Sequence, residues 1–110
     1  MNSLESKAKE YFLEFSNKNI KALKLMFNEE ITLRDWEINA NGINEVVDAN
    51  QKIFDNCETI KVSPLNLYTV DHTVVAELDI LINNEERIKV VDIIKFDKSL
   101  KITSIKAFKG

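Results

Sequence analysis

Cysteine, histidine, glycine and proline are all scarce in this chain of 110 residues. With one cysteine, Cys57, and one histidine, His72, a single chain forms no disulfide and no zinc site built from Cys and His ligands. Two glycines and one proline exclude collagen-like and low-complexity chains. An unpaired cysteine is typical of a reducing compartment, so we expect the protein in the cytoplasm, and we expect no metal.

Excess basic charge and long apolar runs are also missing. Lysine and arginine number 15 against 18 acidic residues, so the net charge is −3 and the chain has no overall attraction to phosphate backbones. No apolar stretch approaches the length of a membrane span, and the first residues show no apolar signal-peptide segment. We therefore expect neither a nucleic acid nor a membrane as partner.

The residues that are abundant predict one soluble globular domain over residues 1–110. Hydrophobic residues make up 45% of the chain and charged residues 30%, which is a globular balance. A chain of this size buries about two-thirds of its surface, which is enough for a core and one modest cavity.

Apolar periodicity predicts helices in the first half and strands in the second. Stripes at three- and four-residue steps predict helices over 4–15, 20–27 and 43–57, with a short strand over 31–36 and a turn over 39–42. Alternation predicts strands over 60–69, 74–82, 88–96 and 100–108, joined by short turns. The fold class is therefore α+β, with helices packed on one face of a curved antiparallel meander.

One carboxylate lies on the wrong face of a predicted strand. Asp92 shares its side of the strand over 88–96 with four large apolar residues, and that side must face the core. An isolated buried carboxylate is costly, so Asp92 must be paired, hydrogen-bonded or protonated.

Two further polar residues point into the same interior. Asp35 ends the inward row of the short strand, and Tyr11 lies within the apolar stripe of the first helix. Each also has a structural interpretation: Asp35 caps the following turn, Asp92 bonds Tyr11 or a backbone N–H, and Tyr11 is ordinary core. The convergence of three polar groups on one apolar space favours a functional site.

Several short motifs, taken in order, resemble a known family. They are Tyr11-Phe12-Leu13, Ile31-Thr32-Leu33-Arg34-Asp35, Asn41-Gly42-Ile43 and Val90-Val91-Asp92-Ile93-Ile94-Lys95-Phe96, with residues 18–27 and 101–108. Their order and spacing resemble the nuclear-transport-factor-2-like (NTF2-like) superfamily, in particular its ketosteroid-isomerase and SnoaL-like branch. The resemblance covers nearly the whole chain. It implies a cone, in which three N-terminal helices close a curved sheet around a pocket.

The resemblance also implies roles for the three polar residues. Asp35 falls where ketosteroid isomerase has its general base, and Tyr11 and Asp92 fall where it has its two oxyanion donors. Such a site removes a proton next to a carbonyl and stabilises the enolate, without a cofactor. Trp36 departs from the pattern, because a proline is common at that position.

Four more residues are candidates for ligand contact. Trp36 follows Asp35 and either narrows the pocket mouth or covers the base. Asn50, in the stripe of the third helix, bonds either a ligand or a neighbouring backbone group. Phe15 and Phe54 lie in the helical stripes and complete the expected apolar wall.

The outer faces of the long strands are too apolar for a solvated surface. Val75, Leu81, Val91 and Ile93 lie there, and they predict a homodimer formed through this face.

We thus expect a protein that binds a small apolar ligand, with isomerase-like or cyclase-like chemistry on a carbonyl compound. The alternative is a non-catalytic dimeric module that binds a ligand or a protein. A cavity of about 300 Å³ or more touching all three polar groups would favour ligand chemistry.

Overall fold

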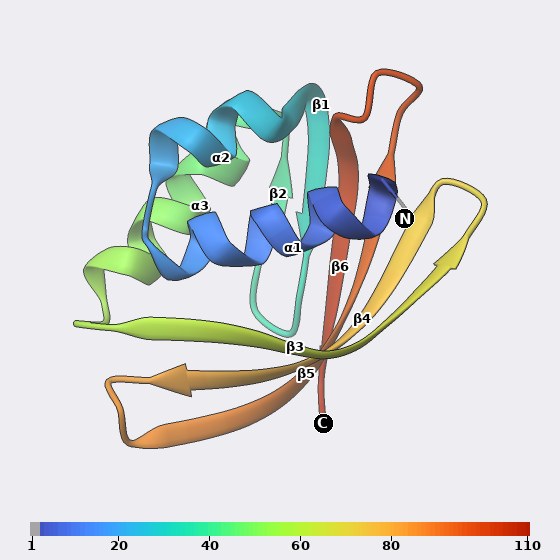
Figure 1. The fold of residues 1–110 in the computed structure, drawn as a ribbon. Helices are drawn as coiled ribbons and strands as arrows, with labels where there is room; N and C mark the ends of the chain where they lie inside the picture. The colour runs from blue at the N-terminus through green and yellow to red at the C-terminus, as the bar shows by residue number, and fades with distance from the viewer. Residues whose placement is uncertain (1–2) are drawn as a thin grey trace.

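Three helices lie on one face of a six-stranded sheet in the computed structural model, which describes residues 3–110 (Figure 1). The helices are α1 (Ser3–Ser16), α2 (Ile20–Met26) and α3 (Ile43–Asp55). The strands are β1 (Phe27–Arg34), β2 (Asn39–Asn41), β3 (Ile60–Val70), β4 (Thr73–Ile82), β5 (Glu86–Phe96) and β6 (Ile102–Lys109). The α+β class and the three helices are therefore confirmed. No helix among the described residues has the length and apolar character that crossing a bilayer requires.

The sheet is mixed, so the prediction of a purely antiparallel sheet is wrong. The strands run in the order β2-β1-β6-β5-β4-β3, and β3 to β6 form the predicted meander. β1, however, pairs in parallel with β6, where Leu33 lies opposite Ile105. Alternation along β1 specifies which face is buried but not which strand lies beside it, so the sequence pattern could not show this pairing.

Three local predictions in the first half also need correction. Phe27, expected in the second helix, begins β1, and residues 39–41, expected as a turn, form β2 beside β1. The strand expected to reach residue 36 ends at Arg34, so Asp35 and Trp36 lie in the loop between β1 and β2. Phe27 and Ala40 are buried in the core, and for Ala40, a residue that is depleted in strands, packing outweighs intrinsic propensity.

Two polar contacts hold the helices in place. Asn19 caps α2 as its spacing predicts, with its side chain accepting a hydrogen bond of 3.1 Å from the Ala22 N–H. The Lys18 ammonium group donates to the carbonyls of Phe54 and Glu58, each at 2.9 Å. Because the last carbonyls of a helix lack partners within it, Lys18 ties the α1–α2 corner to the end of α3.

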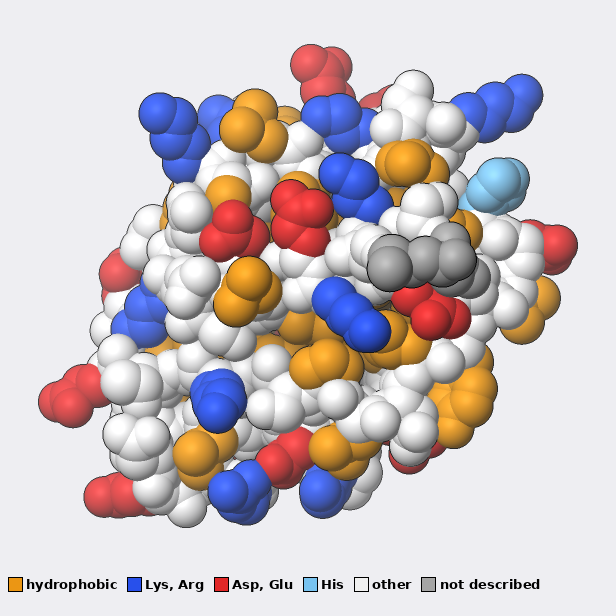
Figure 2. All heavy atoms as spheres, viewed as in Figure 1, with side chains coloured by type: hydrophobic (Ala, Val, Ile, Leu, Met, Phe, Trp, Pro, Cys, Tyr) orange, Lys and Arg blue, Asp and Glu red, His pale blue; other side chains and the backbone are white. Residues whose placement is uncertain are grey.

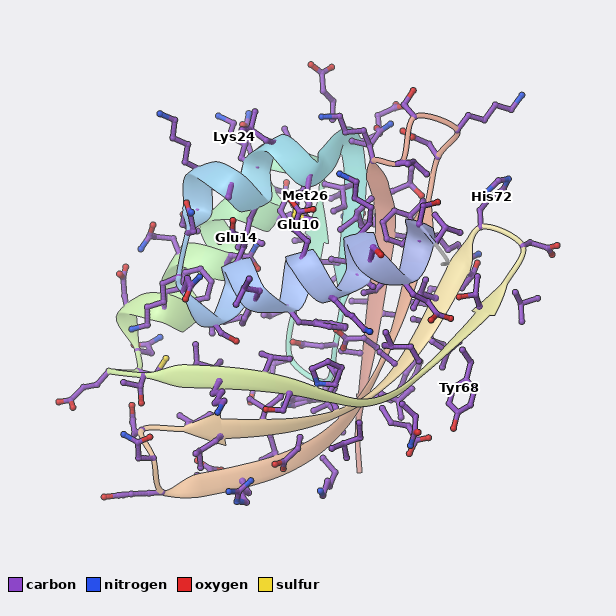
Figure 3. The ribbon with its side chains drawn as sticks, in the orientation of Figure 1. Glu10, Glu14, Lys24, Met26, Tyr68 and His72 are labelled. Atoms are coloured by element: carbon purple, nitrogen blue, oxygen red, sulfur yellow. The ribbon has the colours of Figure 1, made fainter. Side chains whose placement is uncertain are left out.

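The core lies between the helices and the inner face of the sheet. The inward rows of β4 and β5 are buried, and the sheet bends where its ladder shifts register, between Pro64 and Asn66 and between Lys95 and Phe96. Tyr68 lies on the side of β3 away from the helices, and exposed His72 projects from the β3–β4 turn (Figure 3). The face over α1 and α2 carries acidic and basic side chains interspersed (Figure 2).

Candidate active site

A cavity of about 200 Å³ lies between the helices and the inner face of the sheet. Its wall is mostly apolar and includes Phe12, Phe15, Leu33, Ile53, Leu78 and Val90. Tyr11 of α1, Asp35 of the β1–β2 loop and Asp92 of β5 line this same cavity. The structure thus brings together the three polar groups that the sequence singled out. The volume is below the 300 Å³ mark set above, so that criterion for ligand chemistry is not met, and the site suits only a small ligand.

Asp92 is buried and holds its carboxyl group at the cavity wall. It is 7% exposed, and within residues 3–110 no group hydrogen-bonds to its side chain. Burial, and then the charge of Asp35, raises the pKa of Asp92 from 3.8 to about 7. The raised pKa favours the protonated form of Asp92, which is able to donate a hydrogen bond.

Small residues on both neighbouring strands flank Asp92. It pairs across the ladder with Ala76 on β4 and with Ala107 on β6, and Ala107 itself lines the cavity. An alanine at each position leaves free the volume that a larger residue would fill. Sequence reasoning missed both alanines, although their presence in strands rich in Val and Ile was the available signal.

Tyr11 presents a neutral phenol to the same cavity. Its ring packs against Phe12, Phe15 and Phe27 at centroid distances of 5.5, 5.9 and 6.3 Å, which fixes its orientation. Burial, and then the charge of Asp92, raises the pKa of Tyr11 well above its usual value of 10. Within the described chain its hydroxyl has no hydrogen-bond partner, so the alternative in which Tyr11 bonds Asp92 is not found.

Asp35 is half-buried and anchors the loop after β1. Its Oδ1 accepts hydrogen bonds from the backbone N–H groups of Glu37 at 2.7 Å and Ile38 at 2.6 Å. The turn-capping role considered for this residue is therefore present in the structure. The second oxygen, Oδ2, has no hydrogen-bond partner among residues 3–110 and remains open to a ligand. Glu37 and Ile38 also line the cavity, which sequence reasoning missed.

Trp36 and Asn50 both line the cavity, in different surroundings. Trp36 is 45% exposed, so its ring lies at the solvent side of the cavity, with the Lys109 ammonium 5.8 Å from the ring centroid. Asn50, on α3, is 1% exposed, and its Nδ2 has no hydrogen-bond partner in the described residues. The alternative in which Asn50 bonds a neighbouring backbone group is thus not found.

Of the two phenylalanines expected at the wall, one lines the cavity. Phe15 belongs to the lining, whereas Phe54 does not. The Phe54 ring packs edge-on against Phe15, with centroids 4.8 Å apart and planes at 71°. Phe54 therefore supports the cavity wall from behind Phe15. The prediction that Phe54 contacts the ligand is wrong. Among residues 3–110, no group of three or more His, Cys, Asp or Glu side chains is placed to hold a metal ion.

The fold is that of the NTF2-like and SnoaL-like proteins. No protein-family model matches this sequence, and no curated protein sequence matches it either. A protein of Shewanella denitrificans assigned to the SnoaL-like polyketide cyclases superposes with a TM-score of 0.89 at 12% identity, covering 100% of this chain and 92% of that one.

Two other solved structures carry the same fold. A protein of Kribbella flavida assigned as a ketosteroid isomerase gives a TM-score of 0.85 at 11% identity, covering 97% of this chain and 77% of its own. The epoxide hydrolase/cyclase-like enzyme SalBIII acts in pyran ring formation in the polyether salinomycin. It superposes with a TM-score of 0.80 at 20% identity, covering 98% of this chain and 91% of its own. At these identities the likeness establishes the fold alone.

Proposed function

We propose that this protein binds a small apolar carbonyl compound and catalyses its enolisation, as an isomerase or a cyclase does. The observation that carries the proposal is the convergence of Tyr11, Asp35 and Asp92 on one apolar cavity from three different elements. The Tyr11 hydroxyl and the Asp92 carboxyl make no hydrogen bond within residues 3–110, so both are available to a ligand.

The reaction follows from the chemistry of the three groups. Asp35 accepts a proton from the carbon next to the carbonyl. The electron pair of the broken C–H bond forms the C=C bond of the enolate, and the π pair of the C=O bond moves onto the carbonyl oxygen. The Tyr11 hydroxyl and protonated Asp92 donate hydrogen bonds to this oxygen, where the negative charge develops. Return of the proton to the same or another carbon completes an isomerisation. This route needs no metal and no cofactor.

The electrostatics of the cavity support this division of roles. Burial, and then the charge of Asp35, raises the pKa of Asp92, so Asp92 retains its proton more readily than an exposed aspartate does. Asp35 is the half-buried member and is held by two backbone N–H groups, whereas Asp92 lies among apolar side chains. We therefore assign the role of base to Asp35 and the role of proton donor to Asp92. The cyclases and isomerase named above share the fold, which supports the reaction class.

Exchange of the α-hydrogens of cyclohexanone for deuterium, followed by NMR in D₂O, tests the proposal without knowledge of the natural substrate. The wild type should accelerate exchange beyond the buffer rate. Asp35→Asn should reduce the accelerated rate by about 10²–10⁴-fold, because it removes the base yet keeps an oxygen for the loop N–H groups. Tyr11→Phe should reduce it by about 10²-fold. A rate that Asp35→Asn leaves unchanged would show that Asp35 is not the base.

A non-catalytic ligand carrier remains the second candidate, and one observation favours it. The two hydrogen bonds to Asp35 Oδ1 give this residue a structural task independent of catalysis. The same experiment separates the two candidates. A carrier would bind cyclohexanone, as seen by chemical-shift changes at the cavity, with no acceleration of exchange.

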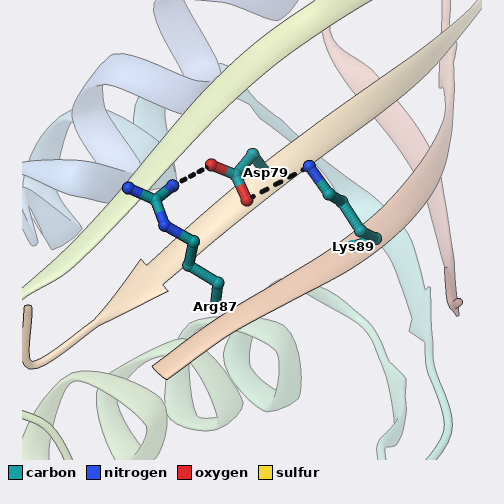
Figure 4. Close-up of polar contacts among 3 residues, drawn as sticks. All are labelled: Asp79, Arg87 and Lys89. Carbon is teal, nitrogen blue, oxygen red and sulfur yellow. Dashed lines mark hydrogen bonds and ion pairs between the residues drawn. The ribbon is translucent and has the colours of Figure 1, made fainter. Parts of the chain in front are cut away.

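We also propose that two copies associate through the outer face of the sheet. Val91 pairs with Phe108 across the β5–β6 ladder, and Tyr68 pairs with Val75 across β3 and β4. Phe108 is 57% exposed and Tyr68 is 52% exposed, so large rings stand on this face without cover. Asp79, paired with Arg87 and Lys89, adds a compensated charge beside the apolar area (Figure 4).

Cytoplasmic location is a further proposal, supported by the state of the thiol. Cys57 is free, and its Sγ donates to the Ile53 carbonyl at 3.3 Å. A single cysteine that follows α3 and forms no disulfide within the chain is typical of proteins in reducing compartments.

A further inference from the structure

Asn50 is a buried polar side chain that the fold itself does not explain. It is 1% exposed and lies on the inner side of α3, between Val46 and Phe54, which are also buried. Its Nδ2 has no hydrogen-bond partner among residues 3–110. A buried donor left unpaired destabilises the folded state, whereas an apolar residue at this position would carry no such cost. An amide that costs stability and lines a cavity is positioned for a group that enters the cavity.

The Asn50 side chain is a fourth polar group at the cavity, separate from the three groups of the proposed reaction. Tyr11 comes from α1, Asp92 from β5 and Asp35 from the β1–β2 loop, whereas Asn50 comes from α3. No hydrogen bond joins Asn50 to any of them in the described chain. The wall elsewhere is largely apolar. A ligand whose only polar atom is a carbonyl oxygen at Tyr11 and Asp92 would leave the Asn50 amide unpaired.

The charged residues that line the cavity determine which kind of ligand oxygen can accept a hydrogen bond from Asn50. Three carboxyl groups line the cavity, from Asp35, Glu37 and Asp92, and no lysine, arginine or histidine is among the described lining residues. An anionic ligand would find no cation to compensate its charge. The group at Asn50 is therefore a neutral acceptor, such as a hydroxyl, ether or second carbonyl oxygen.

The volume specifies the size of the ligand. A cavity of about 150 Å³ holds a benzene molecule. This cavity, at about 200 Å³, is only slightly larger, so it encloses one six-membered ring with two small substituents. A fused multi-ring skeleton does not fit inside it.

We propose that the ligand is a compact neutral compound with two oxygens, a carbonyl held by Tyr11 and Asp92 and a second acceptor held by the Asn50 amide. The proposal rests on the proposed function, because it takes the carbonyl position from it. It adds the substrate class, a single-ring hydroxyketone or its equivalent, and a specificity role for Asn50.

Matched probe pairs test the second oxygen. The pairs are 4-hydroxycyclohexanone with 4-methylcyclohexanone and 3-hydroxycyclohexanone with 3-methylcyclohexanone, which differ in the acceptor while keeping a similar size. Dissociation constants are measured by NMR titration for the wild type and for Asn50→Leu. In at least one pair, the preference for hydroxyl over methyl should fall about tenfold or more in Asn50→Leu, since the apolar side chain offers no donor. Ligand-free Asn50→Leu should melt at or above the wild-type temperature, because it removes an unpaired amide.

A second measurement does not depend on the variant. The side-chain amide protons of Asn50 in the wild type should shift downfield with the preferred hydroxyketone and not with its methyl counterpart. Equal hydroxyl-to-methyl preferences in both proteins, or an unmoved Asn50 amide, would overturn the second-oxygen proposal. Because the four ketones would still bind in that case, the proposed function would stand. If none of the four binds to the wild type, both proposals fail together.

Discussion

Asp92 is the single residue whose ionisation matters most to this protein. Its pKa is raised from 3.8 to about 7, first by burial and then by Asp35, so the folded state keeps a proton that the unfolded chain releases. The stabilising effect of protonated Asp92 is therefore fully present below about pH 4 and is lost as the pH rises through 7. Over this window the loss amounts to at most about 4 kcal/mol.

Asp92→Asn should remove this pH dependence, because the amide does not ionise. Urea unfolding of the wild type and of Asp92→Asn between pH 4 and pH 8 measures the free energy of unfolding. As the pH rises, the variant should become more stable than the wild type by several kcal/mol. Asp97→Asn is the control. The hydrogen bond from Asn28 lowers the pKa of Asp97, so its stabilising effect is lost only as the pH falls below about 4, and the stability difference for Asp97→Asn should stay constant between pH 4 and pH 8. A stability difference for Asp92→Asn that stays constant across the range would contradict the burial argument.

Among the elements, the β1–β2 loop lies at the solvent side of the candidate site. It places Trp36 beside Asp35 at the solvent side of the cavity, and Lys109 of β6 lies over the indole ring. The ring is 45% exposed, so it covers the site without being part of the core.

Trp36→Ala should therefore widen the ligand range. The affinity for the two-ring ketone 2-decalone, relative to cyclohexanone, should rise about tenfold or more, which is the scale of one or two misfitting methylenes in an apolar pocket. Trp36→Phe is the matched control and should change the ratio much less, since it keeps an aromatic ring at the same place. NMR titration measures both affinities. An unchanged ratio in Trp36→Ala would mean that another part of the wall sets the size limit.

At the scale of the whole molecule, the proposed dimer depends on the outer face of the sheet. Val91 lies near its centre, between Glu77 of β4 and Phe108 of β6. Val91→Asp should convert the proposed dimer to a monomer, because the two-fold contact would bury a carboxylate from each copy. Light scattering after gel filtration at micromolar concentration measures the mass.

The control for this experiment is Leu13→Asp. Leu13 is 61% exposed on α1, away from the sheet, so the same chemical change there should leave a dimer. A wild type that is already monomeric at micromolar concentration rejects the dimer. Loss of the dimer in both variants would point to a contact that involves α1.

Much of the fold and part of the site could be predicted from the order of residues. Alternation with period two depends only on neighbouring positions in the chain, so it located β4 and β5 and identified Asp92 as an inward carboxylate. Helical periodicity in the same way identified Tyr11 and Asn50 on buried faces. These conclusions needed no knowledge of which element lies beside which.

The sequence by itself determined which face of each element is buried, because side-chain direction follows from local backbone geometry. Only the tertiary structure decided what meets on those faces. Four features arise from contacts between distant segments. They are the parallel pairing of β1 with β6, the alanines beside Asp92, the unpaired amide of Asn50 and the position of Phe54 behind Phe15. Such contacts depend on register and packing in three dimensions, which a one-dimensional pattern does not encode.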